Sequence, residues 1–199
     1  MSNFFTADNH FFHSNIIIYC DRQWLQNGDL ASNGKWIDDK TKYKRTTEMN
    51  EQMVEEWNET VSPGDNVYIA GDFALNNDPD KIDKLVRSLN GNKYLVTGDH
   101  DSNAVKKCQG FKWVRNLSTS IKVQDTNIVL SHWAYLVWGK SHYGSWNLYG
   151  HSHGKLEEFA NKLSCDIGYD VWKKPVSFEE IKEKMSHKNF TPINKRKNK

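Results

Sequence analysis

The segment Tyr94–Asp101, which reads YLVTGDHD, brings carboxylates and an imidazole together directly after an apolar run. Gly98 lets the backbone turn sharply at the end of the run, and Asp99, His100 and Asp101 come next. Two carboxylates beside an imidazole are costly to crowd together without a cation, so the segment favours metal binding or proton transfer. Taken alone, it fits a solvated Asp-rich turn after a strand equally well.

Side chains of the same types follow other apolar runs. Asp8 and His10 come after such a run and would lie on one side of a strand, where they can grip one ion; a pair on a surface loop is the alternative. Five of the eight histidines belong to this set, and so many at strand ends are hard to explain as isolated residues. The full set at strand ends is Asp8, His10, Asp72, Asp99, His100, His132, His151 and His153.

This mixture of ligands indicates which metals and which reaction to expect. Carboxylate and imidazole together suit manganese, iron or zinc better than calcium or magnesium alone. The set holds more ligands than one ion needs. Two ions about 4 Å apart that share a bridging carboxylate would use them all and would suit phosphoester hydrolysis.

The elements that must position these residues alternate between strands and helices in the first half of the chain. We expect strands at 3–7, 66–72 and 93–97, and helices at 46–61 and 78–90, the latter after Asp78-Pro79. Strands that alternate with helices in this way predict an α/β protein with a parallel sheet. Each strand then delivers an acid at its carboxyl end, in the crevice where open α/β sheets bind ligands.

The second half of the chain has a different pattern. Residues 118–124 and 128–132 flank the turn Asp125-Thr126-Asn127 and predict a hairpin. Further strands are expected near 146–150 and 162–167, and a last helix at about 177–185. The polar segment Trp24–Arg45 contains turn signals and little apolar periodicity, so we expect a surface loop or lid there.

Length and composition limit the number of domains and the location of the protein. The chain of 199 residues is 37% hydrophobic and contains no run of about 18 apolar residues, so we expect one domain that does not cross a membrane. Three widely spaced cysteines predict reduced thiols and a cytoplasmic location. We expect the domain to span 1–186, with an insertion at 24–45 and a basic tail at 187–199. The tail is a frayed end or, alternatively, a nucleic-acid contact.

Five motifs, taken in order, resemble those of the calcineurin-like metallophosphoesterases, whose pattern is DxH, GD, GNH(D/E), H and GHxH. The matching motifs extend from about Phe4 to His153. Two further stretches, 8–17 and 166–176, are similar to a small bacterial and phage subgroup of that family. The resemblance implies a β-sandwich of two mixed sheets flanked by helices, with the metals at one edge.

The resemblance also implies roles for single residues. His100 would be the general acid or a donor to the transition-state oxygen, and Asp101 would orient it. The reaction implied is attack on phosphorus by a metal-bridging hydroxide, without a covalent enzyme intermediate. The cofactor would be two divalent ions, manganese first, with iron, zinc or nickel as the other candidates. The implied ligands of the first ion are Asp8, His10, Asp72 and His153. Asp72 would bridge to the second ion, whose other ligands would be Asp99, His132 and His151.

One residue departs from the family pattern, because the family has an asparagine where this chain has Asp99. A third carboxylate facing two dications predicts tighter binding of the second ion and a slower reaction. Asp99 therefore keeps open a second class of function, a metal-binding protein with impaired catalysis.

Substrate contacts are predicted only by nearness to the motifs. His13, Asn15 and Arg22 are the candidates, Arg22 because a guanidinium pairs with phosphate in a fork; an ordinary ion pair is its alternative. We expect a metal-dependent phosphoesterase that acts on phosphodiesters related to nucleotides or nucleic acid. Phosphomonoesters are the alternative substrates.

Overall fold

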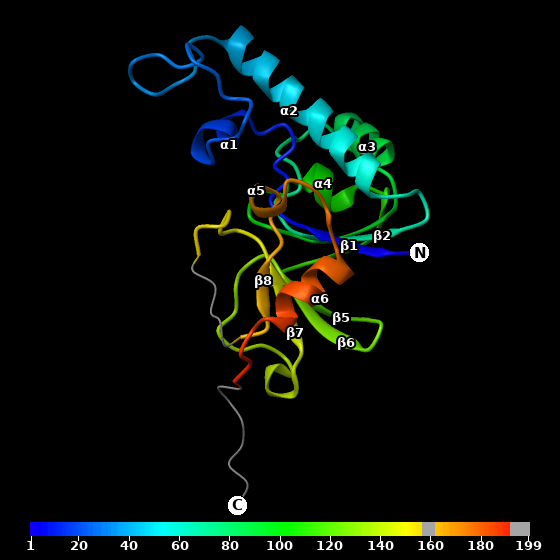
Figure 1. Ribbon diagram of the computed structural model, residues 1–199. Coiled ribbons are helices and arrows are strands. Elements are labelled where there is room, and N and C mark those ends of the chain that lie inside the picture. Colours follow the sequence, from blue (N-terminus) through cyan, green and yellow to red (C-terminus); the bar gives the residue numbers. More distant parts are fainter. Residues whose placement is uncertain (157–161, 192–199) are drawn as a thin grey trace, which may run out of the picture.

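Two mixed β-sheets flanked by helices make up the computed structural model, which describes residues 1–156 and 162–191 (Figure 1). The first sheet has the strand order β4-β3-β2-β1-β9 and the second β5-β6-β7-β8. This is the α/β sandwich expected from the sequence. The parallel strands within each sheet bring the carboxyl ends of several strands to one region.

The first sheet contains the three parallel strands predicted in the first half of the chain. Its strands are β1 (Asn3–Thr6), β2 (Asn66–Ala70), β3 (Asn92–Val96), β4 (Phe111–Arg115) and β9 (Val176–Ser177). β1 to β4 run parallel, and β9 pairs antiparallel with β1. The sequence analysis missed the two edge strands β4 and β9, which are short or only partly apolar.

The second sheet begins with the predicted hairpin. Its strands are β5 (Ser118–Val123), β6 (Thr126–Ser131), β7 (Trp146–Tyr149) and β8 (Ser164–Asp166). β5 and β6 are antiparallel, whereas β6, β7 and β8 are parallel. The parallel pairing matters for function, because His132 and the pair His151 and His153 follow neighbouring strands at the same end of the sheet.

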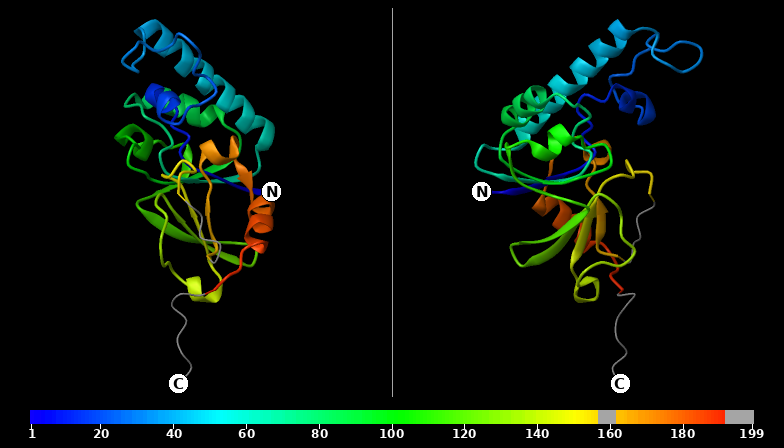
Figure 2. Two further views of the ribbon diagram at one scale, coloured as in Figure 1. Left: turned by 60° about the vertical axis from the view of Figure 1, so that its left-hand side comes forward. Right: turned by 180° about the vertical axis from the view of Figure 1, so that it is seen from behind.

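Six α-helices and a short 3-10 turn, η1, are found among the described residues. The helices are α1 (Ser14–Tyr19), α2 (Asp39–Thr60), α3 (Pro79–Ser88), α4 (Asn103–Lys107), α5 (Tyr169–Trp172) and α6 (Phe178–Ser186), and the turn is Ser141–Tyr143. Figure 2 shows α2 and α3 stacked on the outer side of the first sheet and α6 beside the sandwich. No helix in this part of the chain is long and apolar enough to cross a membrane.

Alternation of side chains along the first sheet divides the core in two. Val67 and Ile69 of β2 pack under the outer helices with Trp57 of α2, whereas Phe5 and Ala70 face the second sheet and pack with Leu130. Successive side chains of a strand point to opposite faces, so each strand contributes to both cores. The first sheet is therefore packed on both faces, by the outer helices and by the second sheet, and this packing positions its strand ends.

Helix α2 begins at Asp39, so the predicted start at Thr46 was wrong and the expected 24–45 loop is shorter. Residues 39–45 contain one aromatic residue, Tyr43, and otherwise polar side chains, so they show no apolar periodicity. The Asp38 carboxylate accepts a hydrogen bond from the Thr41 amide and caps the helix. Arg45 is buried in an ion pair with Asp29, which ties the remaining loop to α2.

The C-terminal helix matches its prediction closely. α6 begins after Ser177, whose hydroxyl accepts from the Glu180 amide while the Glu180 carboxylate accepts from the Ser177 amide, a reciprocal capping box. Helix α1, in contrast, begins at Ser14 without such a cap, because His13 precedes it and makes no capping side-chain bond. Most of the basic tail predicted at 187–199 lies outside the described residues.

Candidate metal centre

The seven predicted metal ligands come from loops that leave five strands at one edge of the sandwich. Asp8 and His10 follow β1, Asp72 follows β2, and Asp99 follows β3. His132 follows β6, and His151 and His153 follow β7. The His132 imidazole Nδ1 lies 2.9 Å from the Ala70 carbonyl oxygen, and this hydrogen bond joins the two sheets beside the cluster.

Asp72 lies at the centre of this arrangement. Its Oδ2 atom is 3.5 Å from His10 Nε2 and 3.4 Å from His132 Nε2, so one carboxylate oxygen faces two imidazole nitrogens. Its Oδ1 atom accepts a hydrogen bond of 2.8 Å from the His100 backbone amide. The three side chains are almost fully buried. A single carboxylate placed between imidazoles from different sheets is suited to bridging two cations.

His10 Nε2 is a buried nitrogen that lacks a hydrogen-bond partner among the described residues. Burial lowers the pKa of His10 to about 2, so its imidazole is neutral and one ring nitrogen carries a free lone pair. The other ring nitrogen, Nδ1, lies 3.3 Å from His13 Nδ1, which leaves Nε2 as the ligand atom. A neutral buried imidazole that faces carboxylates is a fitting metal ligand.

The candidate ligands form two groups, and Asp72 lies between them. Ligand atoms of Asp8, His10 and His153 lie within 4.8 Å of one another, and so do those of Asp99, His132 and His151. A third set with the same spacing joins Asp8, Asp72 and His132 across the two groups. The geometry therefore accommodates two ions, one in each group, with Asp72 between them.

The pKa values of Asp8 and His132 differ from the ordinary values of these side chains. Burial raises the pKa of Asp8 to about 7. Burial lowers the pKa of His132, but the hydrogen bond and charge of Asp72 outweigh this effect and raise it to about 9. A divalent cation would favour the ionised carboxylate and the neutral imidazole instead, because its positive charge replaces that of the protons.

Close backbone approaches pack the ligand loops against one another. A Cβ atom at Gly150 would lie 2.6 Å from the Ala7 Cβ and 2.8 Å from Asp8 Oδ2. The His151 amide donates to both Asp8 oxygens, at 3.0 and 2.8 Å. Glycine is required where β7 ends because any side chain there would displace the Asp8 carboxylate.

Asp101 was expected to orient His100, but its carboxylate binds backbone amides instead. Its carboxylate is buried and accepts hydrogen bonds from the backbone amides of Gly98, Asp72 and Phe73, at 2.8, 3.1 and 2.8 Å. These bonds join the turns after β2 and β3. Asp101 thus holds the backbone of Asp72, and we assign it this structural role instead of the orientation of the His100 ring.

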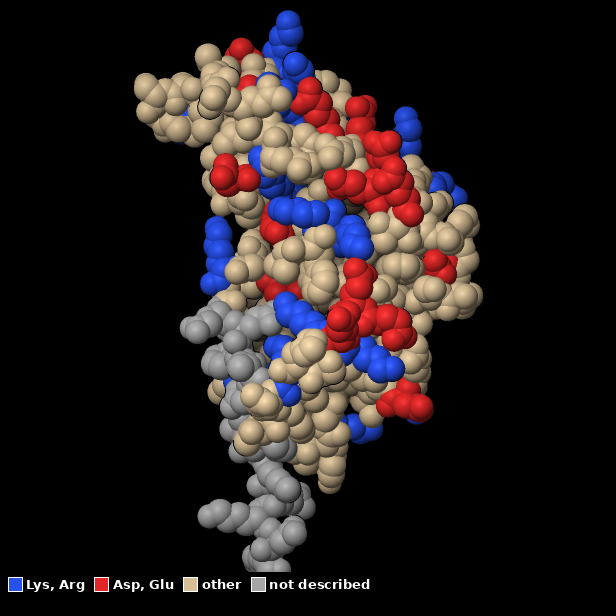
Figure 3. All heavy atoms as spheres, in the orientation of Figure 1, with Lys and Arg blue, Asp and Glu red and all other residues tan. Residues whose placement is uncertain are grey.

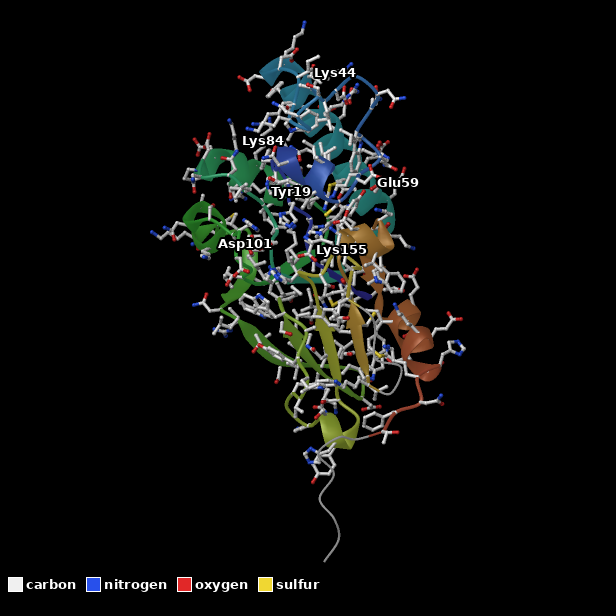
Figure 4. The ribbon with its side chains drawn as sticks, turned by 90° about the vertical axis from the view of Figure 1, so that its left-hand side faces the viewer. Tyr19, Lys44, Glu59, Lys84, Asp101 and Lys155 are labelled. Atoms are coloured by element: carbon white, nitrogen blue, oxygen red, sulfur yellow. The ribbon has the colours of Figure 1, made fainter. Side chains whose placement is uncertain are left out.

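His100 and His13 lie over the cluster on its outer side. The His100 side chain is exposed, and its ring centroid is 5.5 Å from that of His10 and 5.7 Å from that of His13. In Figure 4, Asp101 and Lys155, which belongs to the loop after β7, lie to the left and right, and Tyr19 of α1 lies above, between them. Lys155 Nζ donates to the Tyr19 carbonyl oxygen at 3.3 Å.

The other two substrate candidates are engaged elsewhere. Arg22 is only 1% exposed, and its guanidinium donates to Asp170 and to two backbone carbonyls. The substrate contact expected for Arg22 is therefore replaced by the ion pair that was its alternative. The Asn15 Oδ1 atom accepts from Trp36 Nε1 at 3.1 Å and pins the 24–38 segment to α1.

Two acids beside the cluster received no role in the sequence analysis. Asp166 accepts from the Ser152 hydroxyl and from the amides of Gly154 and Gly168, and it shapes the loop that carries His151 and His153. Asp170 Oδ2 lies 2.7 Å from His153 Nδ1. Asp166 is the last residue of β8 and Asp170 follows shortly after it, so the pattern of a strand that ends in acids could have found them.

Comparisons with known proteins give relatives of unassigned function. No family model matches the chain. An uncharacterized protein of Methanocaldococcus jannaschii, MJ1445, is 27% identical over 186 residues, which cover 88% of this chain and 86% of that protein. The gene 66 protein of Mycobacterium phage D29 is 25% identical over 213 residues, covering 92% and 96% of the two chains.

Solved structures support the fold. The Aquifex aeolicus protein AQ665, of unknown function, superposes with a TM-score of 0.62 at 18% identity, covering 92% of this chain and 98% of its own. A solved archaeal phosphodiesterase aligns at a TM-score of 0.42 and 17% identity, over 84% and 82% of the chains. A likeness at the latter score carries no conclusion about this chain. The former shows that the arrangement of sheets and helices occurs elsewhere.

Proposed function

We propose that this protein is a phosphoester hydrolase of the calcineurin-like metallophosphoesterase type that uses two divalent metal ions. The observation that carries the proposal is Asp72, whose Oδ2 lies 3.5 and 3.4 Å from imidazole nitrogens of two different sheets. The buried His10 Nε2 supports it, because this nitrogen has no hydrogen-bond partner in the part of the chain that the structure describes, and a cation would satisfy its lone pair.

The proposed ligands follow the two groups described above. Asp8, His10 and His153 would hold the first ion, Asp99, His132 and His151 the second, and Asp72 would bridge them. Manganese is the first candidate, and iron, zinc and nickel also suit mixed oxygen and nitrogen ligands. Two such ions, when bound, supply Lewis acidity and a nucleophile derived from water at neutral pH.

The residues of the chain supply the remaining steps. His100 is exposed at the outer side of the cluster, where a substrate phosphate would arrive, so its imidazole can donate a proton to the departing oxygen. His13 lies beside it and would contact the same phosphate. The Asp101 bonds keep Asp72 and the turn after β3 in fixed relative positions, so the donor and the ligands stay aligned.

We assign phosphodiesters as the substrate class, with phosphomonoesters as the alternative. The distribution of surface charge affects where a nucleic-acid substrate could bind. Acidic side chains gather along α2 on the face seen in Figure 3, among them Glu48, Glu51, Glu55 and Glu59. This acidic stretch of α2 disfavours a polyanion, so we place the approach of a nucleotide-related diester at the edge where His100 lies.

The test is manganese-dependent hydrolysis of aryl and alkyl phosphodiesters by the purified protein and by His10→Ala and His100→Ala variants. His10→Ala should abolish the reaction together with one of the two manganese-binding steps, that of the group formed by Asp8, His10 and His153. His100→Ala should keep manganese binding and lose about 100-fold or more in rate, with the larger loss on the alkyl diester, whose leaving group needs the proton more. Equal losses on both diesters would contradict the assigned role of His100. Absence of manganese binding by the unmodified protein would refute the proposed function.

A further inference from the structure

A buried ion pair lies directly behind the proposed first metal group. The side chains of Arg22 and Asp170 are 0% and 5% exposed. They form a bidentate pair in which Arg22 Nε donates to Asp170 Oδ1 at 2.9 Å and a terminal nitrogen donates to Oδ2 at 3.0 Å. Neither residue is a proposed metal ligand, yet both touch the residues that are.

Asp170 controls the orientation of His153. Its Oδ2 atom lies 2.7 Å from His153 Nδ1, so that nitrogen carries a proton and donates it to the carboxylate. The other nitrogen, Nε2, is then the one left to bind a metal. A carboxylate that holds a ligand imidazole in this way fixes both its tautomer and its direction.

Arg22 reaches the other side of the same metal group through the backbone. Its terminal nitrogens donate to the Asp8 carbonyl oxygen at 2.9 Å and to the Asn9 carbonyl oxygen at 3.0 Å. Asp8 and His10, which flank this peptide segment, both have φ of +53°, in the left-handed region. The guanidinium therefore holds the strained loop that carries two ligands, while its partner Asp170 holds the third.

The same neighbourhood contains a group of Cys20, His153 and Asp170 whose ligand atoms lie within 4.8 Å of one another. This group is not a third metal site, because the Arg22 guanidinium already supplies the positive charge that Asp170 faces. The face of the Arg22 guanidinium also packs on the Tyr169 ring, with the guanidinium carbon 5.1 Å from the ring centroid. The cluster is better understood as a support for His153.

We propose that Arg22 and Asp170 act together as a positioning pair that sets the metal affinity of the group formed by Asp8, His10 and His153. The inference rests on the proposed function, since it requires that group to bind a metal. It predicts an effect on one of the two ions, because the pair touches no ligand that belongs only to the second group. Outer residues of this kind typically set metal affinity by about 10- to 100-fold.

The test compares Asp170→Asn with a matched control, Asp29→Asn. Asp29 forms the same kind of buried bidentate pair with Arg45, at 2.7 and 3.1 Å, but lies in the 24–38 segment. Both substitutions remove a carboxylate that pairs with a buried arginine, so both should lower stability; Arg45 keeps its second partner, Glu48, at 2.9 Å, so the loss should be smaller in Asp29→Asn. Calorimetric titration of each purified variant with manganese should show one of two binding steps weakened about 10- to 100-fold in Asp170→Asn and both steps unchanged in Asp29→Asn.

A double variant, Arg22→Met with Asp170→Asn, removes both charges and so guards against failure of the single variant to fold. It should show the same weakened step. Two unchanged steps in Asp170→Asn or in the double variant would overturn the positioning role while the proposed function stands. A wild-type protein that binds no manganese would instead refute the proposed function itself, and the positioning role with it.

Discussion

Replacement of Gly98 by alanine tests the geometry of the bridging carboxylate most directly. A Cβ atom at this position would lie 2.2 Å from Asp72 Oδ1 and 2.5 Å from the Asp72 amide nitrogen. The φ angle of Gly98 lies outside the left-handed region, so alanine fits the backbone conformation. The three atoms nearest to the added Cβ all belong to Asp72, so the main perturbation is a collision with this one ligand and its backbone.

The size of the effect follows from what must move. To relieve the collision, Asp72 and Gly98 must separate by roughly 1 Å, a displacement that can reduce a rate about 100-fold when it misplaces a reacting group. The Asp101 carboxylate resists this separation, because it accepts hydrogen bonds from both backbone amides. We expect a loss of about 1–3 kcal/mol in the free energy of unfolding, as for other added methyl groups in packed interiors.

Gly64→Ala is the matched control. Gly64 also has a φ outside the left-handed region, and its added Cβ would meet no atom within 4 Å. Urea unfolding and manganese titration of both variants separate the site from general effects of alanine. Gly98→Ala should weaken manganese binding and reduce diester hydrolysis about 100-fold, whereas Gly64→Ala should leave both unchanged. Manganese binding by Gly98→Ala equal to that of the wild type would refute the placement of Asp72 at the centre of the site.

Three further predictions concern charge and metal. Asp99→Asn should weaken one manganese-binding step and raise the rate of hydrolysis, because it removes a third carboxylate facing the ions; titration and kinetics that both stay unchanged would contradict this. Manganese at about 100 times its dissociation constant should stabilise the protein by about 2.7 kcal/mol in urea unfolding, and chelation should reverse the gain. Hydrogen bonds from the Ser2 and Ser62 amides lower the pKa of Asp65, so its stabilisation is complete above the unfolded pKa of about 3.9 and is lost as pH falls through the lower, folded value. Unfolding free energies of Asp65→Asn should accordingly fall less steeply below about pH 4 than those of the wild type, and parallel curves would contradict the assignment.

The sequence predicted the strands that deliver the site because a short local pattern repeats. An apolar run followed by glycine or by an acid marks β2 and β3, and the structure confirms that they pair in parallel. Their carboxyl ends must then share an edge of the sheet, so Asp72 and Asp99 could be placed near each other without coordinates. The hairpin of β5 and β6 was predicted on similarly local grounds.

The partners of Arg22 and Asp101 could not be predicted, because they lie in distant parts of the chain. Arg22 meets Asp170, which lies 148 residues further on, and no local pattern in either segment marks the pair. Asp101 sits beside His100 in sequence, yet its carboxylate turns inward to backbone amides near Asp72, 28 to 29 residues earlier. An adjacent acid and imidazole therefore do not predict that the two side chains interact.

The backbone at the ligands carries an independent indication of function. Five of the seven proposed ligands have a left-handed φ between +48° and +67°, namely Asp8, His10, Asp72, His151 and His153. This conformation costs of order 1 kcal/mol or more for a residue with a side chain, and glycine would relieve it. The strain falls on residues that contribute a carboxylate or an imidazole to one cluster, where glycine would remove the ligand. A fold that retains such strain at these positions gains something from the side chains that burial does not supply, and binding of the two proposed ions with Asp72 between them is an interaction in which all five take part.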